Sequence, residues 1–124
     1  MTQGEAVKAY IALCGITAEK WGVKDAYELW RLKKKLAEAF DFQAEREKAI
    51  LDAHHAKPAK NGRWAFDSVE EKDAFQKELD ELNGMEFPAE VKPVCVTPPE
   101  GMTIAPDTLG DLEGFVVFDI GGRG

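Results

Sequence analysis

The chain has 124 residues, of which 44% are hydrophobic and 31% charged, and its formal net charge at pH 7 is −7. These values fit one ordinary globular domain that buries a core without disulfides or metal, and they exclude a wholly disordered chain. Binding to a nucleic-acid backbone needs clustered Lys and Arg, so the acidic balance argues against a direct nucleic-acid partner and leaves a basic protein surface open. No stretch approaches the roughly 18 consecutive apolar residues of a membrane span, and the N-terminus lacks a signal-peptide pattern. We therefore expect no membrane contact and a cytoplasmic protein, with residues 1–120 as a single domain and 121–124 as a flexible tail.

The first predicted helix covers residues 2–13. Thr2 and Glu5 have the capping-box spacing, in which a hydroxyl and a carboxylate satisfy free amides at a helix start. Gly15 is expected to end the helix. Four apolar side chains fall on one face of it: Val7, Tyr10, Ile11 and Cys14.

Residues 23–55 contain no Pro or Gly and are rich in good helix formers, which predicts one long helix ending before Pro58. At about 1.5 Å per residue it would extend about 50 Å. It must therefore protrude, kink near Asp41 or pack along a second long element. The basic run at 31–35 is interpreted as a solvated helix face. The apolar positions form a discontinuous face: Val23, Ala26, Tyr27, Trp30, Ala37, Phe40, Ala44, Ile50 and Leu51.

The Asn61-Gly62 pair predicts a turn, because this dipeptide readily adopts positive φ. The flanking residues 56–59 and 64–66 would either pair as a short hairpin or remain a loop. Ser68 and Glu71 repeat the capping-box spacing, and apolar residues at 69, 75, 79 and 82 predict a second helix that stops at Asn83-Gly84. We expect the two helices to pack as an antiparallel hairpin.

After Gly84 the residue pattern no longer favours a long helix. The β-branched residues at 91, 94 and 96 favour a strand, which Pro88 and Pro93 restrict to a sheet edge. Pro106 fits the first turn of a short helix with apolar residues at 109, 112, 115 and 116 on one face, while residues 115–120 also fit a strand. The predicted fold class is α+β: mostly helical, with a long antiparallel helical hairpin, a small β element and a C-terminal strand or helix segment.

No residue pattern indicates a catalytic, cofactor or metal site. Cys14 and Cys95 lack a CxxC spacing and are interpreted as small buried hydrophobes, with a disulfide between them left open. Adjacent helical residues point about 100° apart, so His54 and His55 fit a polar helix end better than a metal-ligand pair. The glycines of 121–124 lack the strand-to-helix context of a phosphate loop. We therefore expect no cofactor, no metal and no enzymatic activity.

Aromatic and acidic residues supply the candidates for a partner surface. The three tryptophans are expected mainly as core anchors, with Trp64, beside Arg63 in a loop, as the best candidate for an exposed contact. Carboxylates crowd the second hairpin helix, where they either bind a partner or simply solubilise the helix surface. The predicted partner-binding acids are Glu70, Glu71, Asp73, Glu78, Asp80 and Glu81.

Several segments occur in a shared order: residues 7–13, 22–27, 40–46 and 75–79, the Asn61-Gly62 turn, and an acidic and apolar ending at 104–120. Together they resemble an uncharacterised family of small phage and prophage proteins, from which this chain departs at Gly22, where proline is common, and in its tryptophans. The resemblance covers most of the chain and implies phage origin, hence the host-cell cytoplasm. It implies no reaction and no functional residues.

The function predicted from these observations is that of a non-enzymatic phage-type protein that binds another protein. One mechanism is inhibition of a bacterial defence system, such as a CRISPR effector, by carboxylates placed where phosphates lie in a basic nucleic-acid groove. The other is an accessory role in virion or tail assembly, in which the helical hairpin binds an extended partner segment. A small enzyme without a recognisable motif is the third alternative, and self-association is left open.

Overall fold

The computed structural model describes residues 1–88 and 90–119, and helices hold 60% of these residues. Within this described part the α-helices are α1 (Gln3–Ile16), α2 (Val23–Ala53), α3 (Val69–Gly84) and α4 (Pro106–Leu112). The strands are short and form two separate pairs: β1 (Lys57–Pro58) with β2 (Trp64–Ala65), and β3 (Val94–Val96) with β4 (Val116–Phe118). The predicted α+β class, mostly helical, is confirmed.

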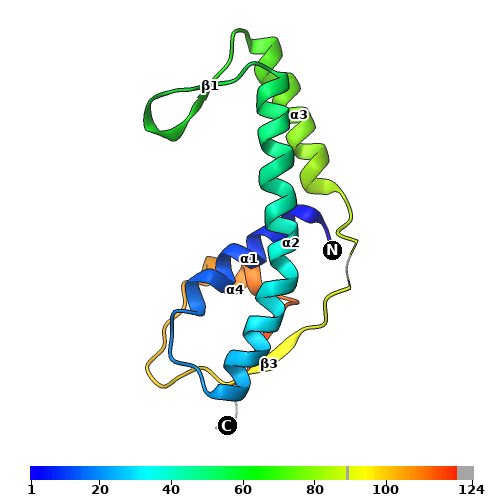
Figure 1. Cartoon of the computed structure of the whole chain (residues 1–124). Coiled ribbons are helices and arrows are strands. Elements are labelled where there is room, and N and C mark those ends of the chain that lie inside the picture. The colour runs from blue at the N-terminus through cyan, green and yellow to red at the C-terminus, as the bar shows by residue number, and fades with distance from the viewer. Residues whose placement is uncertain (89, 120–124) are drawn as a thin grey trace.

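Helix α2 is a single helix of 31 residues that runs the length of the molecule, and other elements pack along both of its halves (Figure 1). We call the part around its first half the body (residues 1–42, 85–88 and 90–119), which contains α1, β3, α4 and β4. The part around its second half is the arm (residues 43–84), which contains the β1–β2 hairpin and α3. None of the helices in the described residues is both long and apolar enough to cross a membrane.

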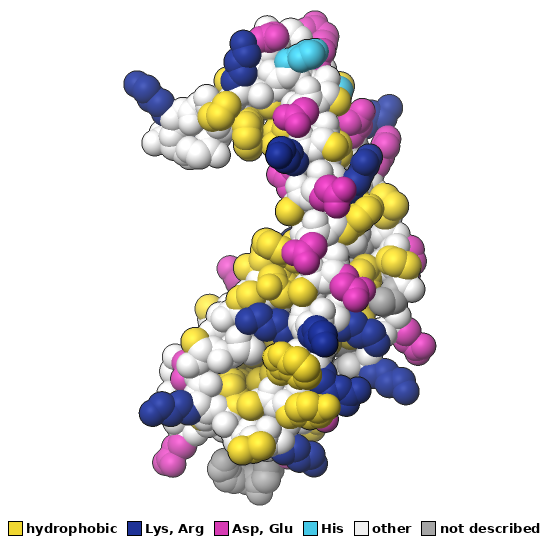
Figure 2. Space-filling model, viewed as in Figure 1, with side chains coloured by type: hydrophobic (Ala, Val, Ile, Leu, Met, Phe, Trp, Pro, Cys, Tyr) yellow, Lys and Arg dark blue, Asp and Glu magenta, His cyan; other side chains and the backbone are white. Residues whose placement is uncertain are grey.

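The body buries a different face of α2 from the one the sequence pattern favoured. The predicted face is wrong in this half of α2, because Val23, Tyr27 and Trp30 are 90%, 55% and 53% exposed, and Figure 2 shows apolar side chains lying open over this end of the molecule. Near the other end of α2, Ile50 and Leu51 are buried as predicted. Apolar residues occur on both sides of α2, and only the packing of α1 decides between them. The buried positions recur every three or four residues: Leu29, Leu32, Leu36 and Ala39.

The tryptophans are not mainly core anchors, which corrects a second prediction. Trp30 and Trp64 are about half exposed, at 53% and 45%. Trp21 is half-buried in the connector between α1 and α2, where its Nε1 donates to the Ile16 carbonyl oxygen at 2.8 Å. Two of the three tryptophans therefore lie largely at the surface.

Helix α1 begins at the predicted capping box but runs past Gly15 to Ile16. Its predicted apolar face is wrong, since Ile11 is 56% exposed and Cys14 is exposed. Three of the six residues on the buried face are alanines, whose small side chains let α1 lie close to α2. Its members are Gln3, Ala6, Ala9, Ala12, Leu13 and Ile16.

The arm confirms the predicted antiparallel helical hairpin. Helix α3 packs against the end of α2 around four buried apolar residues, and α3 stops at Gly84 as predicted. Val69 does not join this core, being 70% exposed. The four are Ile50, Leu51, Phe75 and Leu82.

Of the two alternatives left open for residues 56–66, the β-hairpin forms, with Lys57 opposite Ala65 and Pro58 opposite Trp64. Asn61 and Gly62 both adopt the left-handed conformation, with φ of 67° and 71°, which the Asn-Gly pair accommodates readily. The Phe66 ring lies 5.1 Å from that of Phe75, so the base of the hairpin is anchored to α3.

The C-terminal part of the body is a small parallel β-α-β unit in which α4 links β3 to β4. Pro106 occupies the first turn of α4 as predicted, and residues 116–118 form a strand. Leu109 is 44% exposed, so its predicted place on the apolar face is wrong. The predicted burial of the cysteines is also wrong, because Cys14 and Cys95 are both exposed and free. Residue 120 and the predicted tail at 121–124 lie outside the described residues.

Buried amide side chains join the body to the arm. The Gln3 Nε2 donates to the Ala39 carbonyl oxygen at 2.6 Å and lies 3.5 Å from the Gln43 Oε1. The Gln43 Nε2 in turn donates to the Asn83 Oδ1 at 2.9 Å. Gly4 faces the same place, where a Cβ atom would lie only 3.1 Å from the Asn83 carbonyl oxygen. This network therefore fixes α1, α2 and α3 at one junction.

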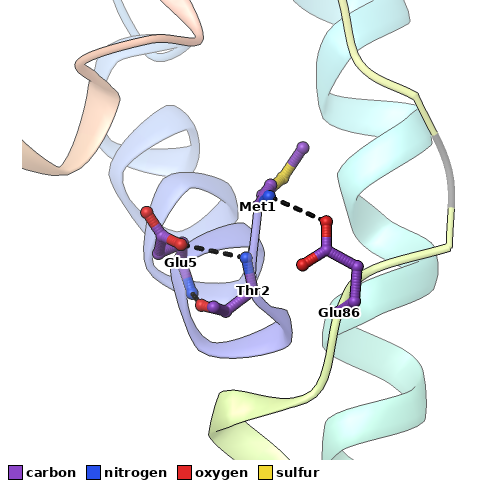
Figure 3. A network of polar contacts seen from close by, with 4 residues as sticks. All are labelled: Met1, Thr2, Glu5 and Glu86. Carbon is purple, nitrogen blue, oxygen red and sulfur yellow. Dashed lines mark hydrogen bonds and ion pairs between the residues drawn. The ribbon is translucent and has the colours of Figure 1, made fainter.

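The first residues of the chain pair with the segment that follows α3 (Figure 3). The Met1 amine lies 3.0 Å from the Glu86 Oε1, and the Phe87 amide donates to the Met1 carbonyl oxygen at 2.9 Å. The backbone amide of Thr2 donates to the Glu5 carboxylate at 2.9 Å. Hydrogen bonds from the Thr2 backbone, and then from its hydroxyl, lower the pKa of Glu5, so the capping carboxylate stays ionised.

Candidate protein-binding surface

The six predicted partner-binding acids of α3 divide into two groups. Since successive residues are 100° apart on a helix, the two acids at 71 and 78 turn toward α2, beside the buried Phe75 and Leu82. The other four lie on the outer side of the helix or its flank and are all exposed: Glu70, Asp73, Asp80 and Glu81. We call these four the outer acidic face.

Helix α3, which carries the outer acidic face, holds much of the negative charge of the chain. Helix α3 holds six acidic residues against two basic ones, a net −4 of the chain's −7. Asp73, Asp80 and Glu81 line a shallow depression together with Gln76 and Lys77. The Gln76 Nε2 donates to Asp80 Oδ1 at 2.9 Å, which holds that carboxylate in place. The outer acidic face therefore presents four exposed carboxylates, one of which is fixed by a hydrogen bond.

The two inward acids hold His54 at the end of α2. Its Nδ1 lies 2.7 Å from the Glu71 Oε2, and its Nε2 lies 3.2 Å from the Glu78 Oε2 in a direction that makes no hydrogen bond. The hydrogen bond to Glu71 raises the pKa of His54, outweighing burial, which lowers it, and the Glu78 carboxylate adds to the increase. The contact of Glu71 with His54 also replaces the second half of the predicted capping box, of which only the bond from the Glu71 amide to Ser68 Oγ is made.

This histidine clasp, His54 with Glu71 and Glu78, was missed by sequence reasoning. The carboxylates are 17 and 24 residues from His54 along the chain, and no local pattern links them. His55 plays a different part: with φ of 56° it is the left-handed residue that ends α2. No group of three His, Cys, Asp or Glu side chains in the described residues could hold a metal ion.

Trp64 borders the first turn of α3. A shallow groove runs from the β2 strand to the start of the helix and includes Trp64, Ser68, Val69 and Lys72. The exposed Val69 and the half-exposed Trp64 give this groove an apolar floor, next to the turn that carries Glu70. The structure therefore places the predicted aromatic contact at one end of the outer acidic face.

The chemistry that these side chains offer is charge and apolar area on an outward surface, which are the means of recognising another macromolecule. Both ring nitrogens of His54 lie against carboxylates that connect two helices, a stabilising arrangement for the arm. The chain showed no significant match to any protein family, to any curated protein or to any solved structure.

Proposed function

We propose that the chain is a non-enzymatic, phage-type protein that acts by binding a basic protein of the host, through the outer acidic face of α3. The observation that carries the proposal is the concentration of four exposed carboxylates on one side of a helix whose other side is packed. Glu70 and Glu81 are 11 positions apart, about 16 Å along the helix axis. A row of carboxylates of that length on one helix presents negative charge much as a short run of phosphates does.

The partner class that fits this face is a protein with a positively charged nucleic-acid groove, such as a CRISPR effector of a bacterial defence system. Carboxylates that occupy the positions of phosphates would block nucleic acid by competition. Complementary charge would also speed association and make it sensitive to salt.

The groove beside Trp64 supports the alternative role in virion or tail assembly. Trp64 and Val69 together offer an apolar strip to an extended segment of another phage protein. Binding by that route depends on buried apolar area and is nearly independent of salt.

A charge-reversal experiment tests the proposal. The triple variant Glu70→Lys, Asp73→Lys and Glu81→Lys leaves the histidine clasp intact and should lose at least about tenfold in affinity for basic host proteins captured from a lysate. Its matched control reverses three exposed acids of the body, Glu100, Asp107 and Glu113, and should bind as the unmodified chain does. Single-stranded nucleic acid should compete with the bound protein.

The same experiment can overturn the proposal. Equal binding by the triple variant and the unmodified chain at every salt concentration would remove the acidic mechanism. If Trp64→Ala then abolished binding, the apolar groove and the assembly role would replace it. Loss of binding in both charge variants would show that only the overall charge matters.

A further inference from the structure

The outward face of α2 carries a row of exposed residues whose charge changes sign halfway along. The positions alternate in steps of four and three residues, the spacing of a coiled-coil seam. All six are exposed, while positions 29, 32, 36, 39 and 43 have the same spacing and are buried on the opposite side. This seam consists of Tyr27, Arg31, Lys34, Glu38, Asp41 and Glu45.

The first half of the seam is basic and aromatic. The Arg31 guanidinium lies 5.8 Å from the centre of the Tyr27 ring, and the Lys34 Nζ lies 5.1 Å from that of Trp30. The two rings are stacked with centroids 5.9 Å apart. The cations are thus held in place over the rings. They also cover ring faces on which a nucleobase would stack, which disfavours single-stranded nucleic acid as the occupant.

The second half of the seam is acidic and unneutralised. Glu38, Asp41 and Glu45 are exposed, and none of them forms an ion pair with another of the described residues. Arg31 has only a 3.9 Å contact with Glu28, and its side chain remains 60% exposed. Figure 2 shows acidic side chains over the middle of α2, and basic and apolar ones over its lower end. One helix therefore displays both halves of a complementary contact.

We propose that a second copy of the chain covers this seam, in an antiparallel dimer with two-fold symmetry. The basic pair and the acidic pair at 41 and 45 are centred about 16 Å apart along the helix. A two-fold axis near residue 38 places Arg31 and Lys34 of each copy opposite Glu45 and Asp41 of the other, which gives four opposite-charge pairs against one like-charge pair, Glu38 with Glu38 at the axis. A parallel, in-register pair would instead set like charges against each other.

The contact closes after two copies because each uses the same surface. Tyr27 and Trp30 of one copy lie at one end of the contact and those of the other copy lie at the opposite end, where their exposed rings supply apolar area. Helix α3 packs against the buried side of α2, so the dimer leaves the outer acidic face free. Failure of the dimer and failure of the proposed function are therefore independent results.

Sedimentation equilibrium over a concentration series tests the dimer, with circular dichroism to confirm the fold of each variant. Arg31→Glu with Lys34→Glu makes the charged positions of the seam acidic, and Asp41→Lys with Glu45→Lys leaves only Glu38 acidic. Each double variant alone should dissociate at least about tenfold more readily than the unmodified chain. An equimolar mixture of the two should form a mixed dimer, because the acids at 31, 34, 41 and 45 of one variant then face the bases at 45, 41, 34 and 31 of the other. Glu38 faces Glu38, as it does in the unmodified pair.

Glu70→Lys with Asp73→Lys on α3 is the control and should keep the dimer intact. A chain that stays monomeric at all concentrations overturns the proposal. So does a dimer that survives both seam variants, or a mixture of folded variants that fails to associate.

Discussion

In the body, 14 of the described apolar residues are buried together, whereas the arm buries four. The body collects its core from helices, strands and loops distant in sequence, while the arm relies on two helices touching along one stripe. Polar contacts supplement the arm: the histidine clasp at its far end and the Gln43–Asn83 bond at its base. The comparison teaches that α2 is stabilised chiefly from one end. The arm should open locally at lower free energy than the body, because opening free energy follows buried apolar contact.

The largest expected effect comes from the core of the body. Leu36 is fully buried, so Leu36→Ala should lower the free energy of unfolding by about 2 to 5 kcal/mol, from lost burial and the cavity left behind. Urea denaturation followed by circular dichroism measures the change. A single transition at lower urea is expected, since loss of the body removes the support of α2. An unchanged midpoint would contradict the assignment of this core.

Phe75→Ala should destabilise the arm by about 3 kcal/mol and leave the body folded. Hydrogen exchange should show faster exchange of amides in α3 and in the last turns of α2, with α1 and β3 unaffected. Uniformly faster exchange throughout the chain would mean that body and arm unfold as one unit, and the comparison between them would fail.

Two glycines of α1 test the junction between the two regions. Gly4→Ala should destabilise the chain by about 1 kcal/mol, because the new Cβ meets the Asn83 backbone at 3.1 Å. Gly15→Ala is the matched control, with nothing within 4 Å of the new atom. It should stabilise by about 0.5 to 1 kcal/mol through helix propensity. Thermal melts of both variants should therefore shift in opposite directions, and equal shifts would contradict the close contact.

The histidine clasp should make the stability of the arm depend on pH. The folded-state pKa of His54 is raised, so its contribution is fully present below the ordinary histidine pKa of about 6.5 and is lost as pH rises through the raised value. Exchange of α3 amides, corrected for intrinsic rates, should show less protection at mildly alkaline than at mildly acidic pH. The variant His54→Asn should abolish the dependence. A dependence that persists in this variant must come from another group.

The smallest expected effect is at the end of α2. His55 adopts a φ of 56°, a conformation that glycine tolerates better than any residue with a Cβ. His55→Gly should therefore stabilise the arm by about 0.5 kcal/mol, with the strain relieved partly offset by the added freedom of the unfolded chain. A thermal melt detects it as a small upward shift. Destabilisation would indicate that the imidazole makes a contact that matters.

The helix starts and the turns of the chain could be predicted from the sequence alone, because they depend on residues only a few positions apart. The caps at Thr2 and Ser68, the Asn61-Gly62 turn and Pro106 at the start of α4 all lie where the pattern predicts. Each is decided by hydrogen bonds or backbone preferences within about four residues. The same locality explains why the helical hairpin and the mostly helical α+β class were predicted correctly.

Only tertiary packing decided which side chains are buried and which residues contact one another across helices. Helix α1 turns its alanines inward and leaves Ile11 and Cys14 outside, because small side chains permit a close approach to α2 that larger ones would prevent. Along α2, apolar residues occur on both sides, with leucines at 29, 32 and 36 on one and aromatic residues at 27 and 30 on the other, and the assembled core covers the leucines. Glu71 and Glu78 look the same as their neighbours in sequence, yet they contact His54 from across the hairpin. Contacts of this kind depend on the distances between elements far apart along the chain, and these are fixed only when the core assembles.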